Sequence, residues 1–361
     1  MFRRCYKLLT GSGCGGGCSS NTINTLNNIN IGVASPVVAT PKKTKNLIGI
    51  SKEDLTKQLT ELGDFQSYRI DQIWSWIYNK GQKNIDNFSN LSNVQKSLLK
   101  EYYHIDYGTL DSDQLSKDGT RKILVGFSGD QVETVFIPEA RRGTLCVSSQ
   151  VGCTFGCKFC FTGTQRLVRN LNVSEILGQF MMARSLMNDF GHTTEKRLIS
   201  NVVFMGMGEP LMNYRAASAA LRIMTDPNGL SLSKSRITVS TSGVVPLIER
   251  LGKEFPGIGL AISLHASNNK TRSEIVPINQ QWPIEELIKT CIEFSKLNTN
   301  KITIDKPEKI KEFASIIANA GLKVTIRQSR GQDILAACGQ LKTESVKVKK
   351  TLPPQLATIS E

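Results

Sequence analysis

The chain has 361 residues, and its 45 Lys and Arg against 31 Asp and Glu give a formal net charge of +14. This length predicts about two to three domains, or one larger barrel with appendages. The sequence has no run of ~18 or more apolar residues, which excludes a membrane span. The basic excess favours an anionic partner such as nucleic acid.

The first 45 residues are predicted to be a disordered leader or a transit peptide. The first acidic residue is Glu53, and the seven Lys and Arg before it carry half of the net charge. An acid-free leader rich in Ser, Asn, Thr and Gly resembles an organellar transit peptide. The alternative is a leader that is disordered because of its biased composition. We therefore expect a cytoplasmic or mitochondrial protein, with the leader favouring mitochondria, and the charge becomes a weak argument for RNA.

Residues 46–140 are predicted to form an N-terminal accessory domain that starts with helices. Ser51, followed by two acidic residues, has the pattern of a helix N-cap. Two or three short helices are expected up to about residue 103. Trp74 and Trp76 fall within them, and we expect both in the core rather than on a base-stacking platform.

A β-hairpin is predicted to follow these helices. Residues 121–127 and 132–137 alternate and are rich in β-formers, and Ser128-Gly129-Asp130 between them is a turn signal.

From residue 141 to residue 341 apolar strands alternate with helices of ten or more residues, which favours a parallel sheet. The expected strands cover residues 144–149, 199–205, 236–240, 259–264, 301–305 and 323–327. The expected helices cover residues 173–190, 214–225, 244–255, 284–297 and 307–320. The predicted fold class is α/β, a partial (β/α) barrel behind a small helical and β-hairpin module. A short basic tail, residues 342–361, ends the chain.

The nine cysteines are scattered and odd in number, which makes a poor disulfide framework and favours a reducing compartment. Cys153, Cys157 and Cys160 have the spacing C-x3-C-x2-C after a predicted strand. Three clustered thiolates suit an iron–sulfur cluster with one iron left without a protein ligand. The spacing is typical of the radical S-adenosylmethionine (radical SAM) superfamily. The alternative is a zinc site with Cys146 as its fourth ligand.

Polar residues end the strands that follow the cysteine loop, where active sites of such barrels lie. Glu209, in a Gly-rich loop, is placed to accept from the ammonium group of a cofactor, or is the solvated acid of an ordinary turn. Hydroxyls at residues 240–242 and at Ser263 are placed to bind a ribose or a carboxylate.

Seven stretches together make the resemblance specific. The chain resembles the RlmN-type dual-specificity RNA adenine C2-methyltransferases over residues 46–341. The stretches are VETVFIP (132–138), TLCVSSQVGC (144–153), NVVFMGMGEPL (201–211), STSGVVP (240–246), AISLHA (261–266), IVPIN (275–279) and AACGQL (336–341).

The resemblance implies the positions that bind the two cofactors in a radical SAM barrel. Cys153, Cys157 and Cys160 match the ligands of a 4Fe-4S cluster. The positions that match the S-adenosylmethionine pocket are Gly208, Glu209, Ser240, Ser263, Leu264 and His265.

The resemblance also implies the catalytic residues. Cys338 matches the cysteine that is methylated first; a 5′-deoxyadenosyl radical then takes hydrogen from that methyl, and the carbon radical adds to adenine C2. Glu133 matches the acceptor of the C2 proton, and Cys146 the thiol that resolves the adduct through a transient disulfide bond with Cys338. Without the resemblance, we would expect Cys338 to be a buried thiol of the hydrophobic core.

The implied partners are large-subunit rRNA and tRNA, with an electron donor such as flavodoxin or ferredoxin. We expect a monomer that has no contact with a membrane. A glycyl-radical activase is a rival within the superfamily, and the presence of both Cys146 and Cys338 argues against it.

One departure from the family pattern follows Asp305. There the sequence runs directly into residues 306–311, which resemble a later helix. The missing stretch is on the order of 40 residues, somewhat more than the ~30 of one βαβ unit. The alternative function is therefore a catalytically impaired or inactive RNA-binding relative that keeps the iron–sulfur cluster.

Overall fold

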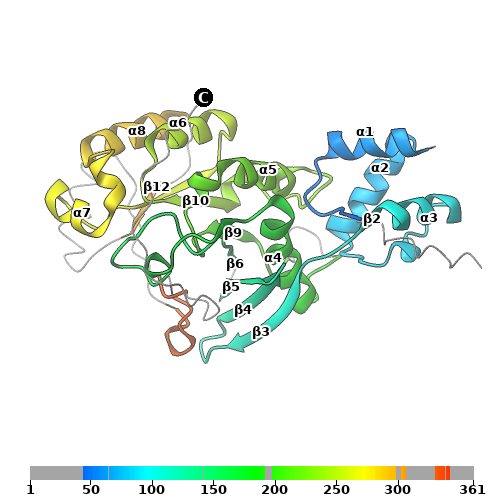
Figure 1. Cartoon of the computed structure of the whole chain (residues 1–361), viewed down its shortest axis with the longest axis horizontal. Coiled ribbons are helices and arrows are strands. Elements are labelled where there is room, and N and C mark those ends of the chain that lie inside the picture. Colours follow the sequence, from blue (N-terminus) through cyan, green and yellow to red (C-terminus); the bar gives the residue numbers. More distant parts are fainter. Residues whose placement is uncertain are drawn as a thin grey trace, which may run out of the picture. The chain divides into compact units, whose positions relative to one another are not determined.

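The structure is a computed structural model that describes residues 44–63, 65–140, 142–191, 197–297, 302–305 (as backbone), 330–337 and 339–341. One eight-stranded sheet forms its centre, in the order β12-β11-β10-β9-β6-β5-β4-β3 (Figure 1). The strands are β3 (Thr109–Leu115), β4 (Arg121–Phe127), β5 (Asp130–Glu139), β6 (Arg142–Cys146), β9 (Asn201–Phe204), β10 (Ile237–Thr241), β11 (Gly259–Ser263) and β12 (Ile302–Asp305).

The N-terminal helices are grouped together in Figure 1. They are α1 (Lys52–Leu62), α2 (Ser67–Trp74), continued by a π-helical turn (Ser75–Asn79), and α3 (Asn93–Tyr102). The predicted cap is confirmed, because the Ser51 side chain accepts from Asp54 N at 3.0 Å. Trp74 is fully buried, and Trp76 is half-buried and stacks on Phe88 with ring centroids 5.4 Å apart. Trp74 therefore belongs to the core, as predicted, whereas Trp76 is partly buried and packs against the core.

The predicted hairpin is confirmed as β4 and β5, joined by Ser128 and Gly129. Both residues have positive φ, 51° and 92°, as the two-residue turn of a tight hairpin requires. Strand β3, which pairs antiparallel with β4, was missed. It is a mostly exposed edge strand with the sequence TLDSDQL, so it lacks the apolar alternation that reveals a half-buried strand.

The other half of the sheet is parallel, from β6 through β9, β10 and β11 to β12. Its helices are α4 (Val173–Leu186), α5 (Tyr214–Thr225), α6 (Val245–Glu254), α7 (Asn269–Ile275) and α8 (Ile284–Leu297). This alternation confirms the predicted α/β class. Helix α4 ends before the predicted residue 190, since Asn188 adopts a left-handed φ of 50°. The predicted helix 307–320 and strand 323–327 lie outside the described residues.

Buried polar contacts join the N-terminal helices to the rest of the fold. Arg184 of α4 is 2% exposed and donates to Tyr78 O at 2.8 Å and, through Nε, to Asp189 O at 2.9 Å. None of the helices in the described part of the chain combines the length and apolar character that a membrane crossing demands.

Candidate active site

Four segments of chain follow strands of the parallel half and lie at one edge of the sheet. Because β6, β9, β10 and β11 run parallel, their carboxyl ends meet there. The segments are the cysteine loop (residues 153–160, after β6 and the short β7, Gln150–Val151) and residues 205–210, 242–244 and 264–266. The cofactor-binding candidates therefore occupy a shared edge.

Glu209 is 3% exposed and joins two of these loops. Its Oε1 accepts from Leu211 N at 3.2 Å, and its Oε2 accepts from Ser242 N at 2.8 Å. Burial raises the pKa of Glu209 to about 7, against the opposing effect of these backbone donors. Side-chain hydrogen bonds from Thr241 and Ser242 act in the same direction as these backbone donors.

Both the backbone conformation and the close packing at position 208 require a glycine. Its φ is 90°, and an added Cβ would lie 2.4 Å from the Cβ of Gln150. Gln150 in turn accepts from Glu209 N at 2.9 Å. A side chain at residue 208 would therefore displace the loop that carries Glu209.

The thiols of the cysteine loop are close neighbours in a poorly solvated place. Cys157 is buried, Cys153 and Cys160 are half-buried, and the Cys157 Sγ lies 3.9 Å from Ser242 Oγ. Burial raises the pKa of Cys153 to about 12 and that of Cys157 to about 11. These two thiols are protonated when alone, so iron binding has to release their protons.

Three thiols in one loop suit an iron–sulfur cluster with one iron left without a protein ligand. A zinc ion in a structural site takes four protein ligands. Cys146, the fourth ligand in the zinc alternative, is held within the sheet opposite Val135 and Val203.

The ends of β10 and β11 contribute the remaining cofactor candidates. Ser240 and Leu264 are buried, and Ser263 and His265 are half-buried. The His265 ring lies 3.6 Å, centroid to centroid, from the ring of Phe159 in the cysteine loop. Burial lowers the pKa of His265 to about 4, so the imidazole is neutral near pH 7.

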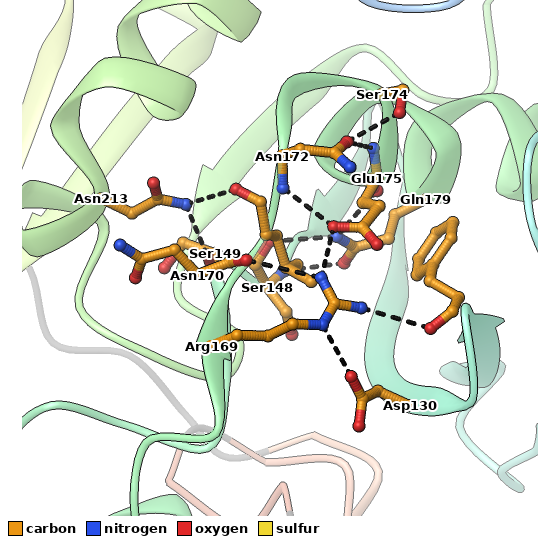
Figure 2. Close-up of polar contacts among 12 residues, drawn as sticks. Asp130, Ser148, Ser149, Arg169, Asn170, Asn172, Ser174, Glu175, Gln179 and Asn213 are labelled. Atoms are coloured by element: carbon orange, nitrogen blue, oxygen red, sulfur yellow. Dashed lines mark hydrogen bonds and ion pairs between the residues drawn. The ribbon is translucent and has the colours of Figure 1, made fainter. Parts of the chain in front are cut away.

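Side-chain amides hold the strand ends where the sheet's own hydrogen bonds stop (Figure 2). Gln179, from α4, accepts from Ser148 N at 2.8 Å and donates to Ser148 O at 3.0 Å. Asn213 donates to Ser149 O at 2.8 Å. Ser148 Oγ accepts from Met207 N at 2.8 Å, which connects this segment to the Glu209 loop. These residues were not predicted from the sequence. The only signal was the polar side chain of Gln179 in a mostly apolar helix.

Two of the three catalytic candidates lie on neighbouring strands. Glu133 on β5 and Cys146 on β6 are both 5% exposed. Cys146 lies opposite Val135, two residues after Glu133, so both side chains point to the same face of the sheet. Glu133 Oε1 forms an ion pair with Lys122 Nζ at 3.2 Å.

Cys338, the third catalytic candidate, lies outside the described residues, but its neighbours on both sides are described. After it, Gly339 O accepts from Phe161 N at 2.7 Å, and Leu341 O accepts from the Thr162 hydroxyl at 2.7 Å. Both donors directly follow the cysteine loop. The segment is therefore attached beside the thiols that the family pattern assigns to the cluster.

Before Cys338, the segment contacts the β3–β4 turn. Gly331 N donates to the Asp118 carboxylate at 3.0 Å, and the Ser116 hydroxyl donates to Asp333 at 2.5 Å. Residues 330–337 and 339–341 thus touch the hairpin on one side and the cysteine loop on the other. The bond between Cys146 and Cys338 stays a prediction, because Cys338 lies outside the described residues.

Comparisons with known proteins agree with this geometry. Residues 147–326 match the radical SAM superfamily, and residues 45–105 match the ribosomal RNA large subunit methyltransferase N-terminal domain. The crystal structure of a radical SAM methyltransferase from Sphaerobacter thermophilus is 32% identical and covers 82% of this chain and 99% of its own, with a TM-score of 0.74.

Two bacterial relatives have the name dual-specificity RNA methyltransferase RlmN. The protein of Gluconobacter oxydans is 39% identical over 93% of this chain and 96% of its own length. That of Bradyrhizobium sp. strain BTAi1 is 41% identical over 87% of this chain and 94% of its own. The first alignment has 392 positions, more than the whole chain, so the relative has residues that this chain lacks. The chain belongs to the RlmN family of radical SAM enzymes.

Proposed function

We propose that this chain methylates C2 of adenine in RNA, with large-subunit rRNA and tRNA as its substrates. The observation that carries the proposal is the shared edge at which the cysteine loop meets the loop of Glu209. This edge occurs in a chain about 40% identical to dual-specificity RNA methyltransferases over most of its length.

The enzyme uses a 4Fe-4S cluster and S-adenosylmethionine. We assign the cluster to the thiolates of Cys153, Cys157 and Cys160. When bound, the two cofactors supply one-electron chemistry that methylates a carbon too electron-poor for polar methyl transfer. The residues assigned to S-adenosylmethionine are Gly208, Glu209, Ser240, Ser263, Leu264 and His265.

The chain's own residues orient the cofactor and keep water out. We assign Glu209 to the ammonium group of S-adenosylmethionine, because its buried carboxylate lies at the shared edge of the sheet and is held in place by two backbone donors. Gly208 allows the close approach of backbone that this position needs. The neutral His265 ring can stack or accept a hydrogen bond without adding a positive charge beside the sulfonium.

Glu133, Cys146 and Cys338 are assigned to the transfer itself. Cys338 carries the methyl group, Glu133 takes the proton from adenine C2, and Cys146 releases the RNA as it forms a disulfide with Cys338. The ion pair with Lys122 holds the Glu133 carboxylate in a fixed position on the sheet. The common face of Glu133 and Cys146 supports their action on one substrate.

The reductant is proposed to be a flavodoxin or a ferredoxin, and the enzyme to act as a monomer. Residues 1–43 of the leader lie outside the described residues. The relatives compared are bacterial, so they do not support import into mitochondria. A fusion of residues 1–45 to a fluorescent protein decides between cytoplasm and mitochondria.

The decisive assay uses the full chain, purified without oxygen and reconstituted with iron and sulfide. With S-adenosylmethionine, a reductant and RNA that lacks the modification, we expect C2-methyladenine by mass spectrometry of the digested RNA. The matched control is C338A, which should retain the cluster and lose the product. The alternative of an impaired relative rests on the shorter chain, and a cluster-loaded protein without any product would establish it.

A further inference from the structure

Arg272 is a fully buried cation in α7, at the base of the proposed cofactor site. Each of its three guanidinium nitrogens donates to a neutral oxygen: Leu264 O at 3.1 Å, Asn279 Oδ1 at 2.7 Å and Ser242 O at 2.5 Å. No carboxylate in the described residues forms an ion pair with it. A buried charge without a counter-charge is costly, so an anion is expected close by.

The ionisable groups that favour the charged form of Arg272 are two thiols, Cys157 and Cys291. Burial in α8 raises the pKa of Cys291 to about 12, so that thiol is neutral. Cys157 is different, because it becomes a thiolate when it binds iron. Ser242 connects the two groups: its carbonyl accepts from Arg272, and its hydroxyl lies 3.9 Å from the Cys157 Sγ.

The helix that carries Arg272 also holds the cysteine loop directly. Lys158 N donates to Ile275 O, at the end of α7, at 3.0 Å. This bond and the Ser242 contact fix the position of Arg272 relative to the cysteine loop. The guanidinium is moreover held by three acceptors on three segments, so it cannot turn away to solvent.

We propose that Arg272 is the counter-charge of the iron–sulfur cluster bound through Cys157, and that it raises the reduction potential of that cluster. The inference rests on the proposed function, since it needs a cluster on the cysteine loop. Reduction adds one electron from an external reductant and makes the cluster more negative, while Arg272 keeps its proton. A fixed cation in a poorly solvated site therefore stabilises the reduced state more than the oxidised one.

The test is a redox titration of reconstituted full-length protein with dithionite, followed by the electron paramagnetic resonance signal of the reduced cluster. R272Q should lower the ratio of reduced to oxidised cluster at least tenfold at a fixed potential, which is 59 mV for one electron. R272K retains the charge and should stay close to the wild type. N279D should act like R272Q, because it places a carboxylate against the guanidinium at a position that is 2.7 Å away in the present structure.

The matched control is R184Q, which removes the other buried arginine, whose partners are Tyr78 and Asp189 and not the cysteine loop. This variant should be less stable yet keep the wild-type potential. A wild-type potential in both R272Q and N279D, or an equal shift in R272K and R272Q, would overturn the inference. If R272Q does not assemble a cluster, N279D decides the matter. Failure of the wild type to bind any cluster would instead refute the proposed function.

Discussion

The strand-end loops and the segment that carries Cys338 are held in very different ways. Glu209 and Arg272 join the loops through buried hydrogen bonds to Ser242 and Leu264. The flank before Cys338 is attached through Asp118 and Asp333, whose carboxylates lie at the surface, whereas the flank after it is held by the buried Thr162 hydroxyl, which donates to Leu341 O. The cofactor site is therefore built into the core of the barrel, and the methyl-carrying segment is fixed to that core on one side of Cys338 only.

The largest effect is expected at Glu209, in the buried region. E209Q removes the charge that we assign to the cofactor ammonium, and hydrogen bonds to charged groups contribute about 1.5–3 kcal/mol. The affinity of the reconstituted protein for S-adenosylmethionine, measured by equilibrium dialysis, should fall by about tenfold to a hundredfold. The control E293Q changes an exposed glutamate of α8 and should leave the affinity unchanged. An unchanged affinity in E209Q would remove Glu209 from the pocket.

The pH dependence of this affinity sharpens the same assignment. Because burial raises the pKa of Glu209 to about 7, the carboxylate gains a proton as the pH falls through neutrality. The affinity for S-adenosylmethionine should therefore drop about tenfold from pH 8 to pH 6. This loss should be absent in E209Q, and an equal loss in both proteins would assign the titration to another group.

Gly208 and Gly129 test how tightly the buried loops are packed. Both have a φ near 90°, but a Cβ at Gly208 would lie 2.4 Å from Gln150, whereas a Cβ at Gly129 would contact nothing within 4 Å. G129A should cost about 1–2 kcal/mol, the strain of a left-handed residue. G208A adds overpacking of about 1–3 kcal/mol to that strain. Urea unfolding measures both, and equal losses would mean that the loop has room for a side chain.

The smallest effect is expected at the attachment of residues 330–337 to the β3–β4 turn. D333A removes the acceptor of Ser116 Oγ and Lys117 N. Because a surface contact contributes only up to about 1 kcal/mol, tryptic cleavage after the exposed Arg330 should become about threefold faster. The control D113A lies on the same hairpin and pairs with Arg121 instead. Equal cleavage of D333A and the wild type would show that the turn does not hold the segment.

Acid should weaken the same attachment. Backbone and hydroxyl donors hold the pKa values of Asp118 and Asp333 below their usual range. The contacts therefore stabilise the attached state above the ordinary pKa of about 3.9 and are lost as the pH falls through the lowered values. Hydrogen exchange of residues 330–337, corrected for the intrinsic rate, should accordingly be unchanged between pH 8 and pH 5 and should become faster as the pH falls below about 3.9. Exchange that stays unchanged in acid would show that these carboxylates do not hold the segment.

The sequence predicted the parallel half of the fold well, because its strands and helices carry clear periodicity. The predicted bounds of α5 and α8 are those of the structure. Strand β3 was missed since an exposed edge strand of polar residues has no apolar face to reveal it. The boundaries predicted between the leader, the accessory domain, the barrel and the tail remain predictions.

The supporting residues of the site were harder to predict than the residues assigned to cofactors. Motifs mark Cys153 or Glu209, but Gln179 and Arg272 acquire their roles only when distant segments meet. Arginines are usually solvated, so nothing in the local sequence shows that Arg272 is fully buried. Such residues are found from the packing of α7 against two strand ends.

Methyl transfer through Cys338 is tested by mass spectrometry of the reconstituted protein after incubation with S-adenosylmethionine labelled in its methyl group. We expect one labelled methyl on the peptide that contains Cys338, before any RNA is added, and none on that peptide in C338A. Label on RNA without label on Cys338, or label on another cysteine in the wild type, would contradict it.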